Sequence, residues 1–191
     1  MTKESKFNNK LIYILFIIIF ILFIVIGTIL IYFLLVKGEP FFMEKQNYPN
    51  NVIMERNNFY IFFNKYIFSI GQNRSANLVV NDYKYYLPNK GLVDNFIKVN
   101  QVEKMNYIKE KNDCDNFSFI LYGNFLEYTY KYNISYAYLF GVIYGYNFNS
   151  NLNHLINFFV DDQYTVYCIE PQNDRIDVCE KFGYEFYRAI I

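Results

Sequence analysis

The chain has 191 residues and carries 18 Lys and Arg against 18 Asp and Glu, so its formal net charge is zero. Balanced charge offers no basic surface for a nucleic acid, and we predict no nucleic-acid partner. Tyr and Phe occur 21 times each and Trp never. With the many Asn, Ile and Lys residues this composition indicates AT-rich coding, so we interpret the aromatics as core residues and not as a stacking surface.

The first element in chain order is an apolar run over residues 11–36, which holds no charge and no proline. A helix of these 26 residues would be about 39 Å long, enough to cross a bilayer core of about 30 Å. The alternative is a cleaved signal peptide, but its apolar core is about 7–15 residues and ends at a small-residue site. We therefore predict one transmembrane helix at 11–36 and a single-pass membrane protein with the lipid bilayer as a partner.

The orientation follows from the basic residues on either side of this run. Those before it are Lys3, Lys6 and Lys10, and those after it are Lys37 and Lys45. Because basic residues are in excess on the cytoplasmic side, we predict a cytoplasmic tail at 1–10 and an extracytoplasmic C-terminal domain.

The rest of the chain is predicted to form a linker at 37–56, broken by Pro40 and Pro49, and one domain at 57–191, too short for two ordinary domains. The expected elements are a helix or strand over 59–70, a turn over 87–91 followed by a short helix, a longer helix from Asn112 or Asp113, a strand region over 135–146, and two strands over 155–160 and 164–169. Helices followed by antiparallel strands predict an α+β domain with a central helix packed on an antiparallel sheet.

Three residues carry the candidate chemistry. Cys114 falls in the first turn of the longer helix, where free amides and the helix dipole lower a thiol pKa. His154 is the only histidine, and therefore the only imidazole that could take a proton from that thiol. If residues 161–163 form a three-residue hairpin loop, Glu170 lies directly opposite His154 and can orient its ring. A buried structural cysteine and an incidental histidine are the alternatives.

Three short motifs in this order resemble a papain-like cysteine peptidase family. They are Asn-Asp-Cys-Asp-Asn-Phe at 112–117, His154 with Asn157 three residues later, and Ile-Glu-Pro-Gln at 169–172. The family includes the C-terminal domain of a mushroom agglutinin and stand-alone relatives in microbes and phages. The resemblance implies a papain-like fold and a Cys114–His154–Glu170 triad acting on a peptide or protein substrate.

On this basis we expect a membrane-anchored thiol hydrolase, most simply a cysteine peptidase. A catalytically inactive binding or assembly module of the same fold is the first alternative. It is kept open by Asn116 and Ser118, where the family motif has Asp and Ala. A transglutaminase-like acyltransferase is the second alternative, because it shares the same Cys-His-acid logic.

The resemblance also implies calcium or another divalent cation near the active site. Carried over by position, its ligands would be Asp115, Glu170 and Gln172. Since Asn116 replaces one carboxylate of the family motif, and cation affinity follows ligand charge, we expect a weakened metal site.

The two remaining cysteines allow two interpretations. Cys168 and Cys179 would pair in an extracytoplasmic domain, leaving Cys114 as the free thiol, whereas all three would stay reduced in the cytosol.

Overall fold

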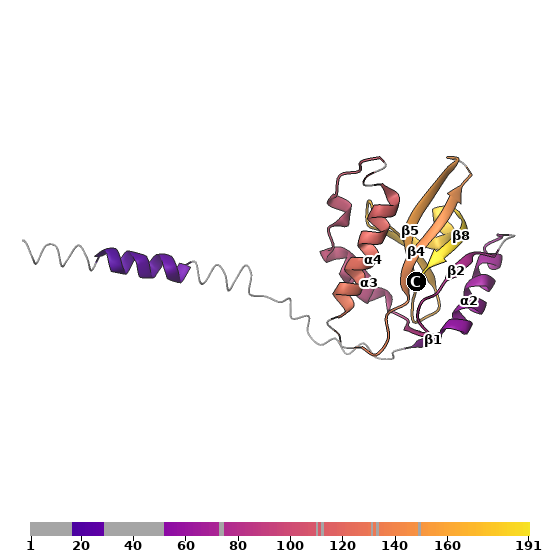
Figure 1. The fold of residues 1–191 in the computed structure, drawn as a ribbon, viewed down its shortest axis with the longest axis horizontal. Helices are drawn as coiled ribbons and strands as arrows, with labels where there is room; N and C mark the ends of the chain where they lie inside the picture. Colours follow the sequence, from indigo (N-terminus) through magenta and orange to yellow (C-terminus); the bar gives the residue numbers. More distant parts are fainter. Residues whose placement is uncertain are drawn as a thin grey trace, which may run out of the picture. The chain divides into compact units, whose positions relative to one another are not determined.

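The structure is a computed structural model that describes residues 17–28, 52–72, 75–109, 111, 113–130, 132, 134–148 and 150–191 (Figure 1). The chain divides into two compact units, Met1–Asn47 and Tyr48–Ile191, which we describe separately.

The first unit corrects the prediction of a transmembrane helix. Its described part is a helix over residues 17–28, about 18 Å long at 1.5 Å per residue. Among the described residues no helix is both long enough and apolar enough to cross a bilayer. The predicted 26-residue span, the single-pass membrane location and the bilayer partner are therefore not supported. The predicted tail at 1–10 and the rest of the predicted span lie outside the described residues.

The second unit is built around a six-stranded sheet. The strand order is β2-β8-β4-β5-β6-β7, and every neighbouring pair is antiparallel except β2 with β8, which are parallel. The strands are β2 Asn77–Val79, β4 Phe140–Asn147, β5 Leu152–Val160, β6 Val166–Glu170, β7 Arg175–Val178 and β8 Glu185–Ile190. A separate two-stranded ladder joins β1 Ile53–Glu55 to β3 Lys84–Tyr86, so a strand lies inside the range predicted as linker.

Helices cover both faces of this sheet (Figure 1). They are α2 Arg56–Ser69, α3 Lys90–Val99 and α4 Cys114–Tyr130, with the short 3-10 helices η1 Val102–Lys104 and η2 Cys179–Phe182. One core packs α2 against one face through Phe63 and Phe158, and the other packs α3 and α4 against the opposite face through Phe125 and Phe159. The second half of β5 is buried throughout because both of its faces are covered.

The longer predicted helix is α4, which begins at Cys114, directly after the predicted start at Asn112 or Asp113. Two buried polar contacts fix its first turns against β5. Ser118 Oγ donates to the Leu155 carbonyl at 2.8 Å, and Asn157 Nδ2 donates to the Ser118 carbonyl at 2.9 Å. These bonds set the N-terminus of α4 beside the start of β5, where His154 lies.

The predicted hairpin exists, but its register differs by two residues. The last ladder pair is Val160 with Val166, so the loop has five residues where we expected three. Asp161 closes this longer loop: its buried carboxylate accepts from the amides of Gln163 at 3.0 Å and Thr165 at 2.7 Å. A shift of two residues keeps every side chain on its original face.

Cys168 and Cys179 form a disulfide that links β6 to η2. This confirms the paired alternative for these two cysteines. Cys114 is the free cysteine and is half-buried.

Candidate functional site

The candidate site lies where the N-terminus of α4 meets the ends of β5 and β6. Cys114 is the first residue of α4, His154 is the third residue of β5, and Glu170 is the last residue of β6. The structure therefore brings together the three residues that the sequence singled out.

Glu170 holds the imidazole from one side. His154 Nε2 lies 2.7 Å from Glu170 Oε2, and the two side chains are 18% and 13% exposed. The other carboxylate oxygen of Glu170 accepts from the amide of Gln172 at 3.4 Å. With Nε2 occupied by this carboxylate, Nδ1 is the ring nitrogen left to meet the thiol of Cys114.

The thiol of Cys114 has a lowered pKa. The largest cause is its hydrogen bond with His154, followed by burial, which acts in the opposite direction. A backbone hydrogen bond from Leu155 and the charge on His154 lower the pKa further, while the charge of Asp113 raises it. Its environment therefore favours the thiolate, which is the nucleophilic form of cysteine.

The pKa of His154 moves in the other direction, to about 9. Burial alone would lower it, but the hydrogen bonds to Cys114 and Glu170 and the charges of both groups outweigh burial. The two shifts move the pair towards a thiolate and an imidazolium. Such a pair attacks electrophiles without a separate base having to remove the thiol proton first.

Tyr184 is a neighbour of His154 that the sequence did not reveal. Its ring lies 5.6 Å from the imidazole, centroid to centroid, with 32° between the planes. This approach requires Gly145, which pairs with His154 across β4 and β5: a Cβ there would lie 2.7 Å from the Cβ of Tyr184. The sequence alone does not indicate Tyr184 as the partner of this glycine.

Asn157 has a structural role in the part of the chain that the structure describes. It is fully buried, and its Nδ2 binds the carbonyls of Ser118 and Gly141. It therefore holds α4 and β4 against β5.

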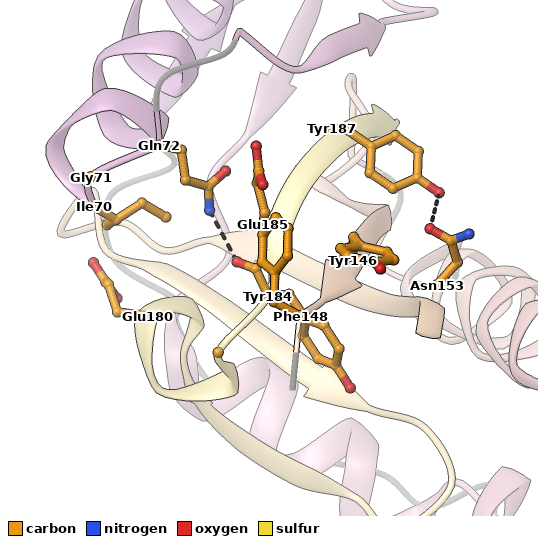
Figure 2. A pocket seen from close by; sticks show the side chains of 11 residues that line it. Ile70, Gly71, Gln72, Tyr146, Phe148, Asn153, Glu180, Tyr184, Glu185 and Tyr187 are labelled. Atoms are coloured by element: carbon orange, nitrogen blue, oxygen red, sulfur yellow. Dashed lines mark hydrogen bonds between the residues drawn. The ribbon is translucent and has the colours of Figure 1, made fainter. Parts of the chain in front are cut away.

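An open groove of about 870 Å³ adjoins the site (Figure 2). Tyr184 lies in its wall and also contacts His154, and Asn153 precedes His154 in the chain. The charges of Cys114 and Glu170 reach Tyr184, because both raise its pKa after burial, which is the larger cause. The groove therefore meets the site through Tyr184, although Cys114, His154 and Glu170 are not among its lining residues.

The predicted cation site gains no support from the recorded contacts. Gln172 donates its amide to Glu170, and Asp115 is an exposed residue whose carboxylate accepts from the amide of Asn116. Within the described ranges, no group of three or more His, Cys, Asp or Glu residues is placed to hold a metal ion. The site at Asp115, Glu170 and Gln172 stays a prediction, and nothing below depends on it.

Comparison with known proteins gives a fold and no family. No family model matches the chain, and no curated protein matches its sequence. Among the solved structures that match, two have a TM-score of 0.61 over 73% of this chain. They are PSL1a in complex with E64, at 19% identity, and Polyporus squamosus lectin bound to the human-type influenza-binding epitope Neu5Aca2-6Galb1-4GlcNAc, at 18%. This chain spans about half the length of each, 50% and 49%.

These findings correct the functional expectations drawn from the sequence. The solved structures are those of a lectin, and no peptidase family is matched. The predicted papain-like peptidase family, the hydrolase activity with its two alternatives, and the peptide or protein substrate are therefore not supported. At such low identity the likeness shows a shared fold.

Proposed function

We propose that this domain captures a ligand by forming a covalent bond at Cys114. The observation that carries the proposal is the position of His154. It forms one hydrogen bond to Glu170 through Nε2 and another with the Cys114 thiol. In proteins, cysteines beside a cationic partner at a helix start are the ones that react.

The bond-forming step uses three side chains. A lone pair of Cys114 Sγ attacks an electrophilic carbon of the ligand, and the group displaced from that carbon leaves with the bonding electrons. His154 keeps its proton during the attack and can donate it to a basic leaving group, while Glu170 holds the imidazolium in place. Capture of this kind needs no turnover.

Iodoacetamide tests the proposal, because Sγ–C bond formation expels iodide and consumes only thiolate. At pH 6 we expect the folded chain to be alkylated on the order of ten-fold faster than the same chain unfolded in urea, since the unfolded thiol has an ordinary pKa. Peptide mass spectrometry should place the adduct on Cys114. E64, the ligand in the PSL1a structure, should add one equivalent to the chain and none to Cys114→Ala.

Two variants complete the test. His154→Gln should lower the folded-state rate at pH 6 towards that of the unfolded chain, and circular dichroism checks that it folds. Glu127→Gln, at an exposed position on α4 about 20 Å from its start, should leave the rate unchanged. Equal rates for folded and unfolded chain, or an unaffected His154→Gln, would overturn the proposal.

A glycan is a second candidate ligand, favoured by one observation. The groove combines aromatic rings, including Tyr146 and Tyr187, with the amide of Asn153, a mixture of apolar faces and polar groups that suits a sugar ring. The carboxylates of Glu180 and Glu185 in the same wall would repel an acidic sugar. A neutral glycan that protects Cys114 from iodoacetamide would support this candidate.

A further inference from the structure

The groove that meets the site at Tyr184 is assembled from segments far apart in the chain. Residues 70–72 after α2 line it, as do residues around the β4–β5 connection (Tyr146, Phe148 and Asn153) and residues around the start of β8 (Glu180, Gly183, Tyr184, Glu185 and Tyr187). Figure 2 shows Tyr184 and Glu185 in the middle of this wall, with Tyr146 and Tyr187 to one side and Glu180 to the other. The groove is therefore part of the folded domain and is fixed by its sheet.

Its charge has one sign. Glu180 and Glu185 line it, and none of the described residues in its wall is Lys or Arg. Neither carboxylate takes part in an ion pair recorded for the described residues. Two acids without a basic partner create a negative potential in a concave site, which attracts cations.

Three basic residues of the described chain near these segments have other partners. Lys181 Nζ lies 2.8 Å from Asp177 Oδ1. The guanidinium of Arg175 lies 4.3 Å from the ring centre of Phe182 and donates to the Lys181 carbonyl at 3.0 Å. That of Arg188 lies 5.6 Å from the ring centre of Tyr144.

The uncharged walls add a second preference. Four aromatic residues face the groove: Tyr146, Phe148, Tyr184 and Tyr187. An ammonium or guanidinium group within about 6 Å of such a ring is attracted by its π-electrons. The amide of Gln72 is already committed, because it donates to the Tyr184 carbonyl at 3.0 Å and accepts from the Phe186 amide at 2.9 Å.

We infer that this groove selects an organic cation, that is, an amine or guanidinium carried on an apolar scaffold. Binding of the cationic group would bring the neighbouring atoms of the ligand towards Cys114. The inference rests on the proposed reactivity of Cys114 and adds the class of ligand. Glu180 and Glu185 supply the charge, the aromatic walls supply the contact area, and Tyr184 joins the groove to His154.

Three methanethiosulfonates of different charge test the inference on the full chain. They are the neutral methyl reagent, the cationic 2-aminoethyl reagent and the anionic 2-sulfonatoethyl reagent. In each case Cys114 Sγ attacks the sulfenyl sulfur, a new S–S bond forms, and methanesulfinate leaves with the electrons of the broken S–S bond. The intrinsic reactivity of the thiol contributes to every rate, so it cancels in the ratio of the cationic rate to the neutral rate.

We expect this ratio to be about ten-fold higher in the folded chain than in the same chain in urea. The imidazolium of His154 favours the anionic reagent, whereas the carboxylates of Glu170 and Asp113 favour the cationic one. The double variant therefore decides whether a cationic preference comes from the groove. Glu180→Gln with Glu185→Gln should bring the ratio to within about two-fold of the unfolded value, whereas Glu127→Gln should leave it unchanged.

A folded ratio equal to the unfolded one, a preference for the anionic reagent, or no response to the double variant would overturn the inference. The neutral reagent alone tests the proposed function. If the neutral reagent reacts no faster with the folded chain than with the unfolded chain, the proposed reactivity of Cys114 is wrong. The ratio of the cationic to the neutral rate would still measure the charge preference of the groove.

Discussion

His154 and Glu170 are 2.7 Å apart, Nε2 to Oε2, although they are not paired across the β5–β6 ladder. Because Asn157 pairs with Ile169, the two residues are diagonal neighbours. Diagonal positions on one sheet face are within reach of long side chains. Glu170 can therefore reach the imidazole from a diagonal position on the same face of the sheet.

The first prediction concerns the pKa of His154. Glu170→Gln removes a charge and a hydrogen bond that both raise it, so the pKa should fall from about 9 by about one unit or more. His154 is the only histidine, and its ring protons can be followed by NMR without assignment of others. Glu127→Gln is the matched control, and a shift no larger than that of the control would contradict the role given to Glu170.

How much of this site could be predicted depends on the range of the interactions involved. The start of α4 near residue 113 could be predicted from the local sequence, and the common face of His154 and Glu170 follows from strand periodicity. The register does not follow, because loop length depends on the Asp161 carboxylate folding back onto Thr165, a choice that periodicity does not encode.

Long-range features could not be predicted. The run over residues 59–70 fits a helix or a strand, and only packing shows Phe59, Phe63 and Ile67 on one buried helix face. The groove is harder still to predict from the sequence, because its walls come together only when β8 is paired with β4.

The second prediction is that the stabilisation provided by Glu170 depends on pH. Unfolded His154 has a pKa of about 6.5, and folded His154 about 9. The stability gained from the protonated ring is thus complete below about pH 6.5 and is lost as the pH rises through about 9. Urea unfolding of the parent and Glu170→Gln should differ most at pH 6 and least at pH 10, by about 1.4 kcal/mol for each pKa unit removed. If the difference in the free energy of unfolding between the parent and Glu170→Gln grew with pH, Glu170 would not stabilise the protonated ring of His154.

The third prediction concerns the disulfide. Cys168 and Cys179 are separated by 11 residues, and opening so short a loop should lower the free energy of unfolding by roughly 3 kcal/mol in the loop-entropy model. The double variant Cys168→Ala with Cys179→Ala tests this by denaturant titration, with Cys114→Ala as the control that leaves the bond intact. In the oxidised, unfolded parent one thiol should titrate, and three would contradict the pairing.

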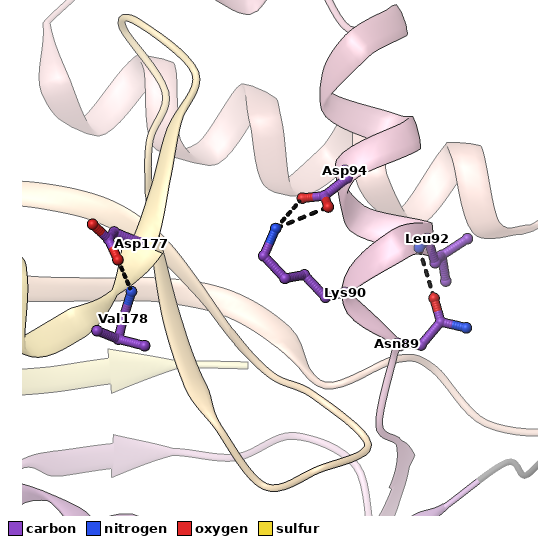
Figure 3. Close-up of polar contacts among 6 residues, drawn as sticks. All are labelled: Asn89, Lys90, Leu92, Asp94, Asp177 and Val178. Atoms are coloured by element: carbon purple, nitrogen blue, oxygen red, sulfur yellow. Dashed lines mark hydrogen bonds and ion pairs between the residues drawn. The ribbon is translucent and has the colours of Figure 1, made fainter.

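The last prediction separates a helix cap from a surface ion pair at the start of α3. Asn89 Oδ1 accepts from the Leu92 amide at 2.8 Å, and Lys90 Nζ lies 2.7 Å from the Asp94 carboxylate one turn later (Figure 3). Asn89→Ala should lower the free energy of unfolding by about 1 kcal/mol, because the Leu92 amide loses its side-chain acceptor and keeps only the Asn89 carbonyl at 3.1 Å. Asp94→Asn should cost only about 0.3–0.5 kcal/mol, since exposed pairs four residues apart contribute little. Asn89→Asp should restore most of the loss in urea titrations, because aspartate caps as well as asparagine. Equal losses for Asn89→Ala and Asp94→Asn would show that the cap does not hold the start of α3.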